Sequence, residues 1–231
     1  LQLQARGRFR RALQYQLSYT LSRSLDDVSD VFDLAGSSSL PQDSLTLDGE
    51  RGPSNFDARH RISYSFIYTV SKSDRTGRLF NAILAGLQLS GTGQFQTGQP
   101  FTVNSIFDVN LDGNLTDRLN STDGLIKTGD RRQPLKLTVD PATLLAPVGQ
   151  DGAVGRNTFR AGSLLDLNLS ALKEFTLGRG HRVTLRLDVF NFVNRANFGV
   201  PVRYLEAAGF GQAVNTVTPR RRVQLAVKYS F

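Results

Sequence analysis

The 231-residue sequence contains no cysteine, no methionine and no tryptophan. Without cysteine it can form neither a disulfide framework nor a thiolate metal site. It also lacks an apolar run as long as a membrane-spanning helix, so membrane insertion would require a β-barrel. The start at Leu1 shows no leader of signal-peptide type, with charged residues before an apolar stretch. We therefore expect the sequence to be a piece of a longer chain.

Positive charge is in excess, and the formal net charge is +8. Such a charge suits a nucleic-acid binder, but no basic helix or recognition motif occurs. We therefore expect no nucleic-acid partner, and we interpret the basic clusters as rims that face anionic lipid, including lipopolysaccharide. These clusters stand at predicted strand ends and turns: Arg6, Arg8, Arg10 and Arg11; Arg131 and Arg132; Arg220, Arg221 and Arg222.

Apolar and polar residues alternate along most of the chain. In residues 13–22, Leu and Tyr alternate with Gln, Ser and Thr, which is typical of a β-strand by period and by residue type. The same pattern predicts about seven strands, most of them long enough to cross a bilayer. The predicted strands are residues 1–5, 13–22, 62–70, 83–96, 165–171, 182–189 and 223–231.

The last predicted strand carries its largest apolar group at its end. A wall between lipid and a watery lumen needs one apolar and one polar strand face, as this segment has. The pattern resembles the signal that hands outer-membrane proteins to the barrel-assembly machinery, which we therefore expect as a partner. Its residues are Val223, Leu225, Val227, Tyr229 and Phe231.

The links between the predicted strands alternate in length. Short links are expected near Gly7, at residues 74–77 and at residues 178–180, whereas the intervening links, at residues 24–57, 98–162 and 194–219, are long and polar. Outer-membrane barrels have short periplasmic turns and long extracellular loops. The pattern therefore predicts an all-β fold, an antiparallel transmembrane β-barrel segment with its long loops outside the cell.

A soluble β-sandwich is the alternative, since alternating strands are its signature as well. The polar face of a sandwich normally carries Lys, Glu and Thr. Here it is rich in Gln, Ser, Thr and Asn, and the apolar face is nearly free of charge until the strand ends, as contact with lipid requires. The composition of the two faces favours the barrel.

Several segments, taken in order, resemble the C-terminal barrel region of TonB-dependent outer-membrane receptors, in particular the Oar-like group that carries a carboxypeptidase-regulatory-like domain. These segments are residues 13–27, 55–62, 98–101, 155–160, 188–199 and 223–231. The resemblance covers residues 1–231 and implies an N-terminal plug inside a larger barrel of about 22 strands. It also implies a TonB partner, bound through an N-terminal region that this sequence lacks.

The function that the resemblance implies is active uptake of a scarce nutrient across the bacterial outer membrane. The alternative functions are a structural or adhesive barrel that displays its long loops, and a passive porin. We expect no enzyme, because no nucleophile elbow, Walker loop or dinucleotide fingerprint occurs. The two histidines, His60 and His181, stand far apart at strand ends without the spacing of metal ligands.

One loop segment contains the first half of a calcium-binding pattern. Oxygen-bearing side chains alternate at Asp108, Asn110 and Asp112, and Gly113 permits a sharp turn. The second half departs from the pattern, because Leu119 stands where an EF-hand has glutamate and Asp117 comes two residues earlier. The segment therefore predicts either a calcium site, with Asp117 or a distant carboxylate completing the shell, or an ordinary polar turn.

Overall fold

The computed structural model describes residues 1–10, 12–29, 41–43, 45–72, 77–178 and 180–231. Seven long strands form one antiparallel sheet in the order β1-β2-β5-β6-β11-β12-β13, so each strand pairs with the long strand before it in the chain. The strands are β1 (Gln2–Phe9), β2 (Leu13–Leu21), β5 (His60–Thr69), β6 (Gln88–Gln96), β11 (Leu164–Gly178), β12 (His181–Phe190) and β13 (Arg222–Ser230). Each of the seven predicted strand segments overlaps one of these strands.

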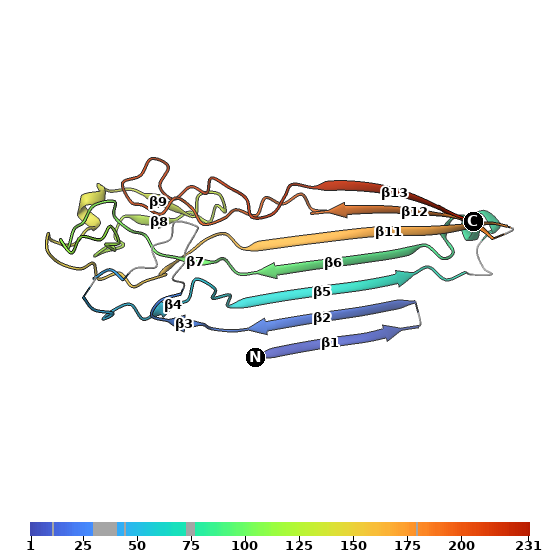
Figure 1. The fold of residues 1–231 in the computed structure, drawn as a ribbon, viewed down its shortest axis with the longest axis horizontal. Coiled ribbons are helices and arrows are strands. Elements are labelled where there is room, and N and C mark those ends of the chain that lie inside the picture. Colours follow the sequence, from blue (N-terminus) through green and yellow to red (C-terminus); the bar gives the residue numbers. More distant parts are fainter. Residues whose placement is uncertain (11, 30–40, 44, 73–76, 179) are drawn as a thin grey trace.

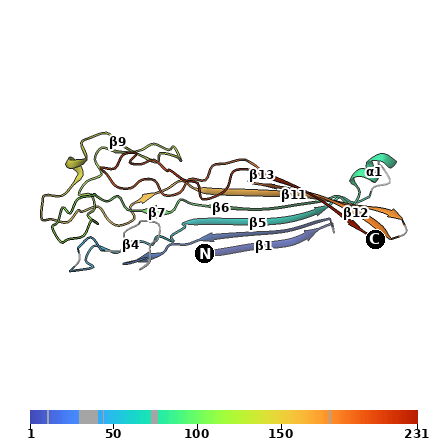
Figure 2. The same ribbon diagram turned by 45° about the horizontal axis from the view of Figure 1, so that its top comes forward.

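The sheet is a single layer with two edge strands, β1 and β13, and it is not closed into a barrel (Figures 1 and 2). The long links, residues 22–59, 97–163 and 191–221, all lie beyond the same end of the strands (Figure 1). We call this the loop end, and the opposite end the turn end. No helix among the described residues is long and apolar enough to span a membrane.

The described parts of the three long links pack together into one unit, which we call the loop body (Figure 1). It contains three small two-stranded sheets and a 3-10 helix, Pro141–Leu144. The small sheets pair β3 (Leu25–Asp26) with β4 (Gly52–Pro53), β7 (Pro100–Phe101) with β10 (Phe159–Arg160), and β8 (Leu125–Lys127) with β9 (Leu135–Leu137).

The hydrophobic core lies in the loop body and not against the large sheet. Its buried side chains come from the second and third links, and they are Phe101, Val103, Leu119, Leu135, Leu144, Phe159 and Leu205. The sequence pattern did not indicate this core, because these residues follow no period of two or of 3.6 along the chain. The loop body thus buries its apolar side chains against one another, whereas the large sheet has no such core.

Two predicted turn positions were wrong. The first turn comes after β1 ends at Phe9 and not near Gly7, which sits inside β1 opposite Tyr15. A Cβ atom on Gly7 would lie 2.8 Å from the Tyr15 hydroxyl, so glycine there makes room for a ring and does not mark a turn.

The link expected to be short at residues 74–77 extends over residues 70–87 and contains the helix α1 (Arg78–Leu84). Ile83 and Ala85, predicted to begin a strand, instead belong to this helix and its C-cap. Leu79 and Ile83 are four residues apart, as on one helix face, and Gly86 ends the helix with a φ of +77°. The strand itself begins at Gln88. Residues 73–76, in the predicted turn itself, lie outside the described part of the chain.

Candidate functional site: the two sheet faces and the loop body

One face of the large sheet is apolar and exposed. Strand register places Leu17, Tyr64, Gly93 and Leu167 in one row across it, and the neighbouring rows repeat this chemistry. The exposure is large on the outer strands, with Leu225 72% and Val227 66% accessible. A continuous apolar surface of this kind needs a partner, and lipid chains are the partner that suits a sheet face flanked by polar ends.

Aromatic rings fill the two glycine positions on this face. A Cβ atom on Gly93 would lie 2.4 Å from Tyr64 Cε1, and one on Gly91 would lie 2.4 Å from Phe66 Cε1. The rings of β5 therefore lie over the glycines of β6, which keeps the apolar surface continuous where β6 itself contributes no side chain.

The charged exception on the apolar face is Lys173, which pairs with Leu185 near the turn end. Its Nζ donates a hydrogen bond to the carbonyl of Ala85 and lies 5.4 Å from the centre of the Phe175 ring. The ammonium thus reaches past the strands to a carbonyl beside α1, as a lysine does when it extends its charge from apolar surroundings toward water.

Both histidines lie on the apolar face, at opposite ends of the sheet, and each is paired with a tyrosine. At the loop end a hydrogen bond of 2.9 Å joins the Tyr19 hydroxyl to His60 Nδ1, and at the turn end one of 2.8 Å joins the Tyr229 hydroxyl to His181 Nδ1. The rings are stacked in both pairs. Amphipathic rings at both ends of an apolar band are typical of the two membrane interfaces.

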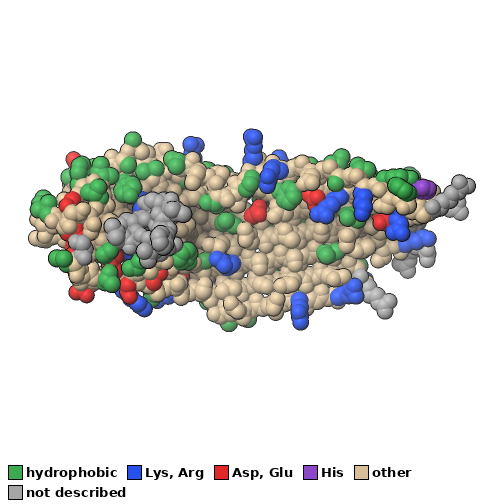
Figure 3. Space-filling model, viewed as in Figure 1, with side chains coloured by type: hydrophobic (Ala, Val, Ile, Leu, Met, Phe, Trp, Pro, Cys, Tyr) green, Lys and Arg blue, Asp and Glu red, His purple; other side chains and the backbone are tan. Residues whose placement is uncertain are grey.

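The opposite face is mostly polar, with Ile67, Leu164, Leu172 and Phe190 as apolar exceptions. In its middle a depression of about 410 Å³ is lined by side chains from β2, β5, β6 and β11. They are Gln16, Ser63, Ser65, Thr92, Gln94, Asp166 and Asn168. Figure 3 shows this face: over the strands most of the surface is neither hydrophobic nor charged, with scattered Lys and Arg side chains. Such a face requires water or a polar solute against it.

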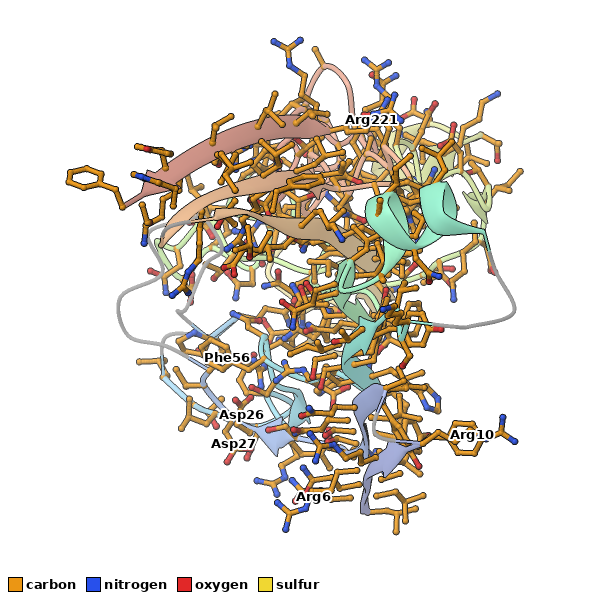
Figure 4. All side chains as sticks on the ribbon, turned by 90° about the vertical axis from the view of Figure 1, so that its right-hand side faces the viewer. Arg6, Arg10, Asp26, Asp27, Phe56 and Arg221 are labelled. Atoms are coloured by element: carbon orange, nitrogen blue, oxygen red, sulfur yellow. The ribbon has the colours of Figure 1, made fainter. Side chains whose placement is uncertain are left out.

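Charge on the polar face is mainly positive. Arg186 Nε lies 2.8 Å from Asp188 Oδ2 along β12, and Arg182 lies 4.0 Å from Glu174 of β11. Arg6 and Arg8 of β1 have no carboxylate within 4.0 Å among the described residues. In Figure 4 Arg6 lies on the same side of the sheet as Asp26, Asp27 and Phe56 of the first link, whereas Arg10 projects on the other side. The first link therefore lies on the polar side of the sheet.

Buried ion pairs join the first link to the second within the loop body. The guanidinium of Arg118 lies 2.5 Å from the carboxylate of Glu50, and both side chains are almost fully buried. Arg156 binds the Asp26 carboxylate and also donates to the carbonyl of Glu50, and Arg160 binds the Asp57 carboxylate. These residues were missed as a site by sequence reasoning, because each carboxylate and its arginine are far apart in the chain.

The ion pairs change the acidity of two carboxyl groups. Burial raises the pKa of Asp26, but the hydrogen bond from Arg156 and its charge outweigh burial, and the pKa falls below its usual value. The same balance, with Arg160 as the partner, lowers the pKa of Asp57. Both carboxyl groups therefore stay ionised at more acidic pH than usual, and so do the ion pairs that connect the first and second links.

The predicted calcium segment forms a tight turn whose carboxylates bind its own backbone. Asp117 accepts hydrogen bonds from the amides of Val109 and Asn110, at 3.0 and 3.2 Å, and Asp108 accepts from the amides of Asp112 and Gly113. Burial is the main cause that raises the pKa of Asp117, and the charges of Asp108 and Asp112 add to it.

The structure thus brings Asp108, Asn110, Asp112 and Asp117 together. Among the described residues, however, no group of three or more His, Cys, Asp and Glu side chains is arranged as a metal site. Calcium binding at this turn stays a prediction.

The residues of the predicted assembly signal lie on one face of β13 and just beyond it. Val223, Leu225, Val227 and Tyr229 pair with the apolar face of β12, and the Phe231 ring lies 5.9 Å from the Tyr229 ring. All five side chains are exposed. Their recognition by the assembly machinery stays a prediction.

Comparison with known proteins gives one match. A family model described as an outer membrane beta barrel domain matches residues 1–224. No curated protein matches the chain, and no solved structure does. The matched range includes the first six long strands, the loop body and the start of β13 (Arg222–Ser230).

Proposed function

Since this chain belongs to the outer membrane beta barrel domain family and lies in the bacterial outer membrane, we propose that it forms barrel strands of a TonB-dependent receptor that takes up a scarce polar nutrient. The apolar face contacts lipid, and the polar face lines the lumen. The open edges of the sheet support a larger barrel, because unpaired strand edges are not stable in hydrocarbon.

The observation that carries this proposal is the continuous polar face with its depression of about 410 Å³. Amides, hydroxyls and the carboxylate of Asp166 line it from four strands. A lumen wall that only supported the fold would need no such depression, whereas a solute that passes along it needs groups that replace its bound water.

The resemblance to TonB-dependent receptors adds the energy source to the proposal. A receptor of that kind is closed by its plug at rest, so it conducts no ions without its partner. The full-length protein in a planar lipid bilayer with potassium chloride on both sides should therefore give no steady conductance, and it should crosslink to TonB in cells. A stable ohmic conductance without crosslinking would make it a passive porin and overturn the proposal.

The second candidate function is display of the loop body on the cell surface. The observation that favours it is the separate hydrophobic core and the buried Arg118–Glu50 pair, which give the loop body a fixed shape. A protein that serves only display would also be silent in the bilayer, but it would not crosslink to TonB. The crosslinking result therefore separates the two functions.

A further inference from the structure

A pocket of about 490 Å³ lies in the loop body, away from the polar face of the sheet. The end of β8 and its link to β9 form one wall, including Lys127, Asp130 and Arg131. The end of β10 and the segment from it to β11 form the other, including Arg160 and Ser163. The pocket thus lies directly above the strands, where the second link returns to the sheet.

The wall carries more positive than negative charge. Lys127 and Arg131 have no carboxylate within 4.0 Å among the described residues. Arg160 is paired with Asp57, and Asp130 uses one carboxylate oxygen to accept a hydrogen bond from the Arg132 amide, at 2.7 Å. The carboxylate of Asp130 is the one acidic side chain in the lining.

A fourth cation, Arg195, binds a residue of the pocket wall. Arg195 Nη2 donates to the carbonyl and to the hydroxyl of Ser163, at 3.0 and 2.9 Å. Arg131 donates to the carbonyl of Ala196, the next residue along the third link, and its positive charge acts on Arg195. Burial lowers the pKa of Arg195, and the charge of Arg131 lowers it further.

The arrangement of Arg131 and Arg195 is unfavourable in free energy without a bound anion. Two like charges are held together without a counter-ion among the described residues, and the buried Nε of Arg195 has no hydrogen-bond partner there. Lys127, Arg131 and Arg160 line the pocket and Arg195 stands behind it. Together with the carboxylates of Asp130 and of Asp57, the partner of Arg160, they leave an excess of two positive charges. A phosphate monoester carries about that charge with opposite sign, and guanidinium groups match its oxygens well.

We propose that the pocket between the β8–β9 link and the start of β11 binds a phosphate group, with Lys127 and Arg131 as its direct ligands and Arg195 positioning Ser163. The site does not depend on nutrient uptake, because a display protein could bind the same group. The phosphate can come from a soluble phosphorylated compound or from the headgroup of lipopolysaccharide.

Titration calorimetry with inorganic phosphate tests the site in the full-length protein, purified in detergent without lipopolysaccharide. Lys127→Gln combined with Arg131→Gln should weaken binding more than about tenfold, since each lost charge-assisted hydrogen bond contributes more than one ordinary bond. Arg220→Gln combined with Arg221→Gln removes the same charge from exposed positions elsewhere in the third link and should change binding less than about twofold. No phosphate binding by the unaltered protein, or equal weakening in both variants, would overturn the proposal.

A second measurement uses the unaltered protein and so does not depend on how the variants fold. Phenylglyoxal modifies exposed arginines, and phosphate should slow its reaction at Arg131 while leaving Arg220 and Arg221 unaffected. Equal rates at Arg131 with and without phosphate would contradict the site.

The source of the phosphate is distinguished by a third titration, with intact and with dephosphorylated lipopolysaccharide. Binding of the intact form alone, displaced by inorganic phosphate, identifies the lipid headgroup as a ligand of this pocket. Binding of inorganic phosphate with no response to lipopolysaccharide identifies a soluble ligand. Equal binding of both lipopolysaccharide forms, undisturbed by phosphate, would show recognition of another part of the lipid and would contradict the proposal.

Discussion

At the scale of single residues, Gly98 shows how closely the loop body is packed. A Cβ atom there would lie 1.8 Å from the backbone oxygen of Ala161, and the neighbouring Gln99 carbonyl accepts a hydrogen bond from the Ala161 amide at 2.9 Å. The β7–β10 pair, which contributes Phe101 and Phe159 to the core, is built directly on this contact. No side chain can enter it without moving the backbone.

We therefore expect Gly98→Ala to destabilise the loop body by about 1–3 kcal/mol, as overpacking does in a close-packed interior. Gly77→Ala is the matched control, because no atom of a described residue other than its chain neighbours lies within 4 Å of a Cβ at Gly77, and its φ of −61° suits alanine. Limited trypsin digestion of the two full-length variants measures the difference. Similar digestion of both would mean that the Gly98 contact does not support the core.

At the scale of single elements, β13 presents two chemically different faces with the same backbone. Leu225 pairs with Leu187 on the apolar face, and the adjacent Gln224 pairs with Asp188 on the polar face. Because arginine at the middle of a lipid-facing strand costs about 2–4 kcal/mol, we expect Leu225→Arg to lower the amount of protein in the outer membrane. Gln224→Arg, which adds the same charge beside Asp188, should leave that amount nearly unchanged.

The comparison is made at equal synthesis, by the amount of heat-modifiable protein in isolated outer membranes. If the two arginine variants accumulate equally, the assignment of lipid and lumen faces is incorrect.

The ion pairs between the first and second links predict how the loop body responds to acid. The pKa values of Asp26 and Asp57 lie below their ordinary 3.8 in the folded protein. Such groups stabilise the fold above that ordinary value, and their contribution is lost as the pH falls through the lower folded values. We therefore expect the connection between the links to weaken below about pH 3.8, where the unfolded form begins to bind more protons.

Hydrogen exchange of the Ala161 amide, corrected for the intrinsic effect of pH, measures this weakening. Asp57→Asn should make exchange faster at neutral pH and less dependent on acid. Asp27→Asn is the control, since Asp27 pairs with Arg51 at the exposed surface, 3.4 Å apart. The pKa of Asp117 is raised, so protonation of Asp117 favours the folded form as the pH falls and cannot cause the weakening. If Asp57→Asn kept the original acid response, another group would be its source.

The elements differ in how far the sequence predicts them. A strand between lipid and water must alternate at every residue, so all seven long strands could be predicted from local pattern. Helix α1 could not, because Ile83, Ala85 and Leu87 also alternate, and only the spacing of Leu79 and Ile83 indicates a helix. The pairs of Glu50 with Arg118 and of Asp57 with Arg160 depend on how three links fold together, which no local pattern determines.

At the scale of the whole molecule, all three long links gather at one end of the sheet and α1 at the other (Figure 1). These 231 residues contain no cysteine, so a single introduced cysteine reports on the end of the sheet where it stands. Asp123→Cys and Asn215→Cys, both in the loop body, should react with an impermeant thiol reagent on intact cells. Lys72→Cys, at the turn end, should react only after the outer membrane is opened.

Labelling of Lys72→Cys on intact cells, with no reaction at Asp123→Cys, would reverse the orientation in the membrane. Arg179, in the turn between β11 and β12, would be the natural third position, but it lies outside the described residues.

The separation of the hydrophobic core from the large sheet has a consequence for how this protein can change over generations. Lipid chains are fluid and adapt to any apolar outline, so one aliphatic residue on the sheet's outer face can replace another almost freely. Leu119, Leu144 and Leu205 meet fixed neighbours in the loop body and have no such freedom. In this protein we therefore expect the lipid-facing side of the sheet to tolerate apolar substitutions, and the core of the loop body to tolerate few.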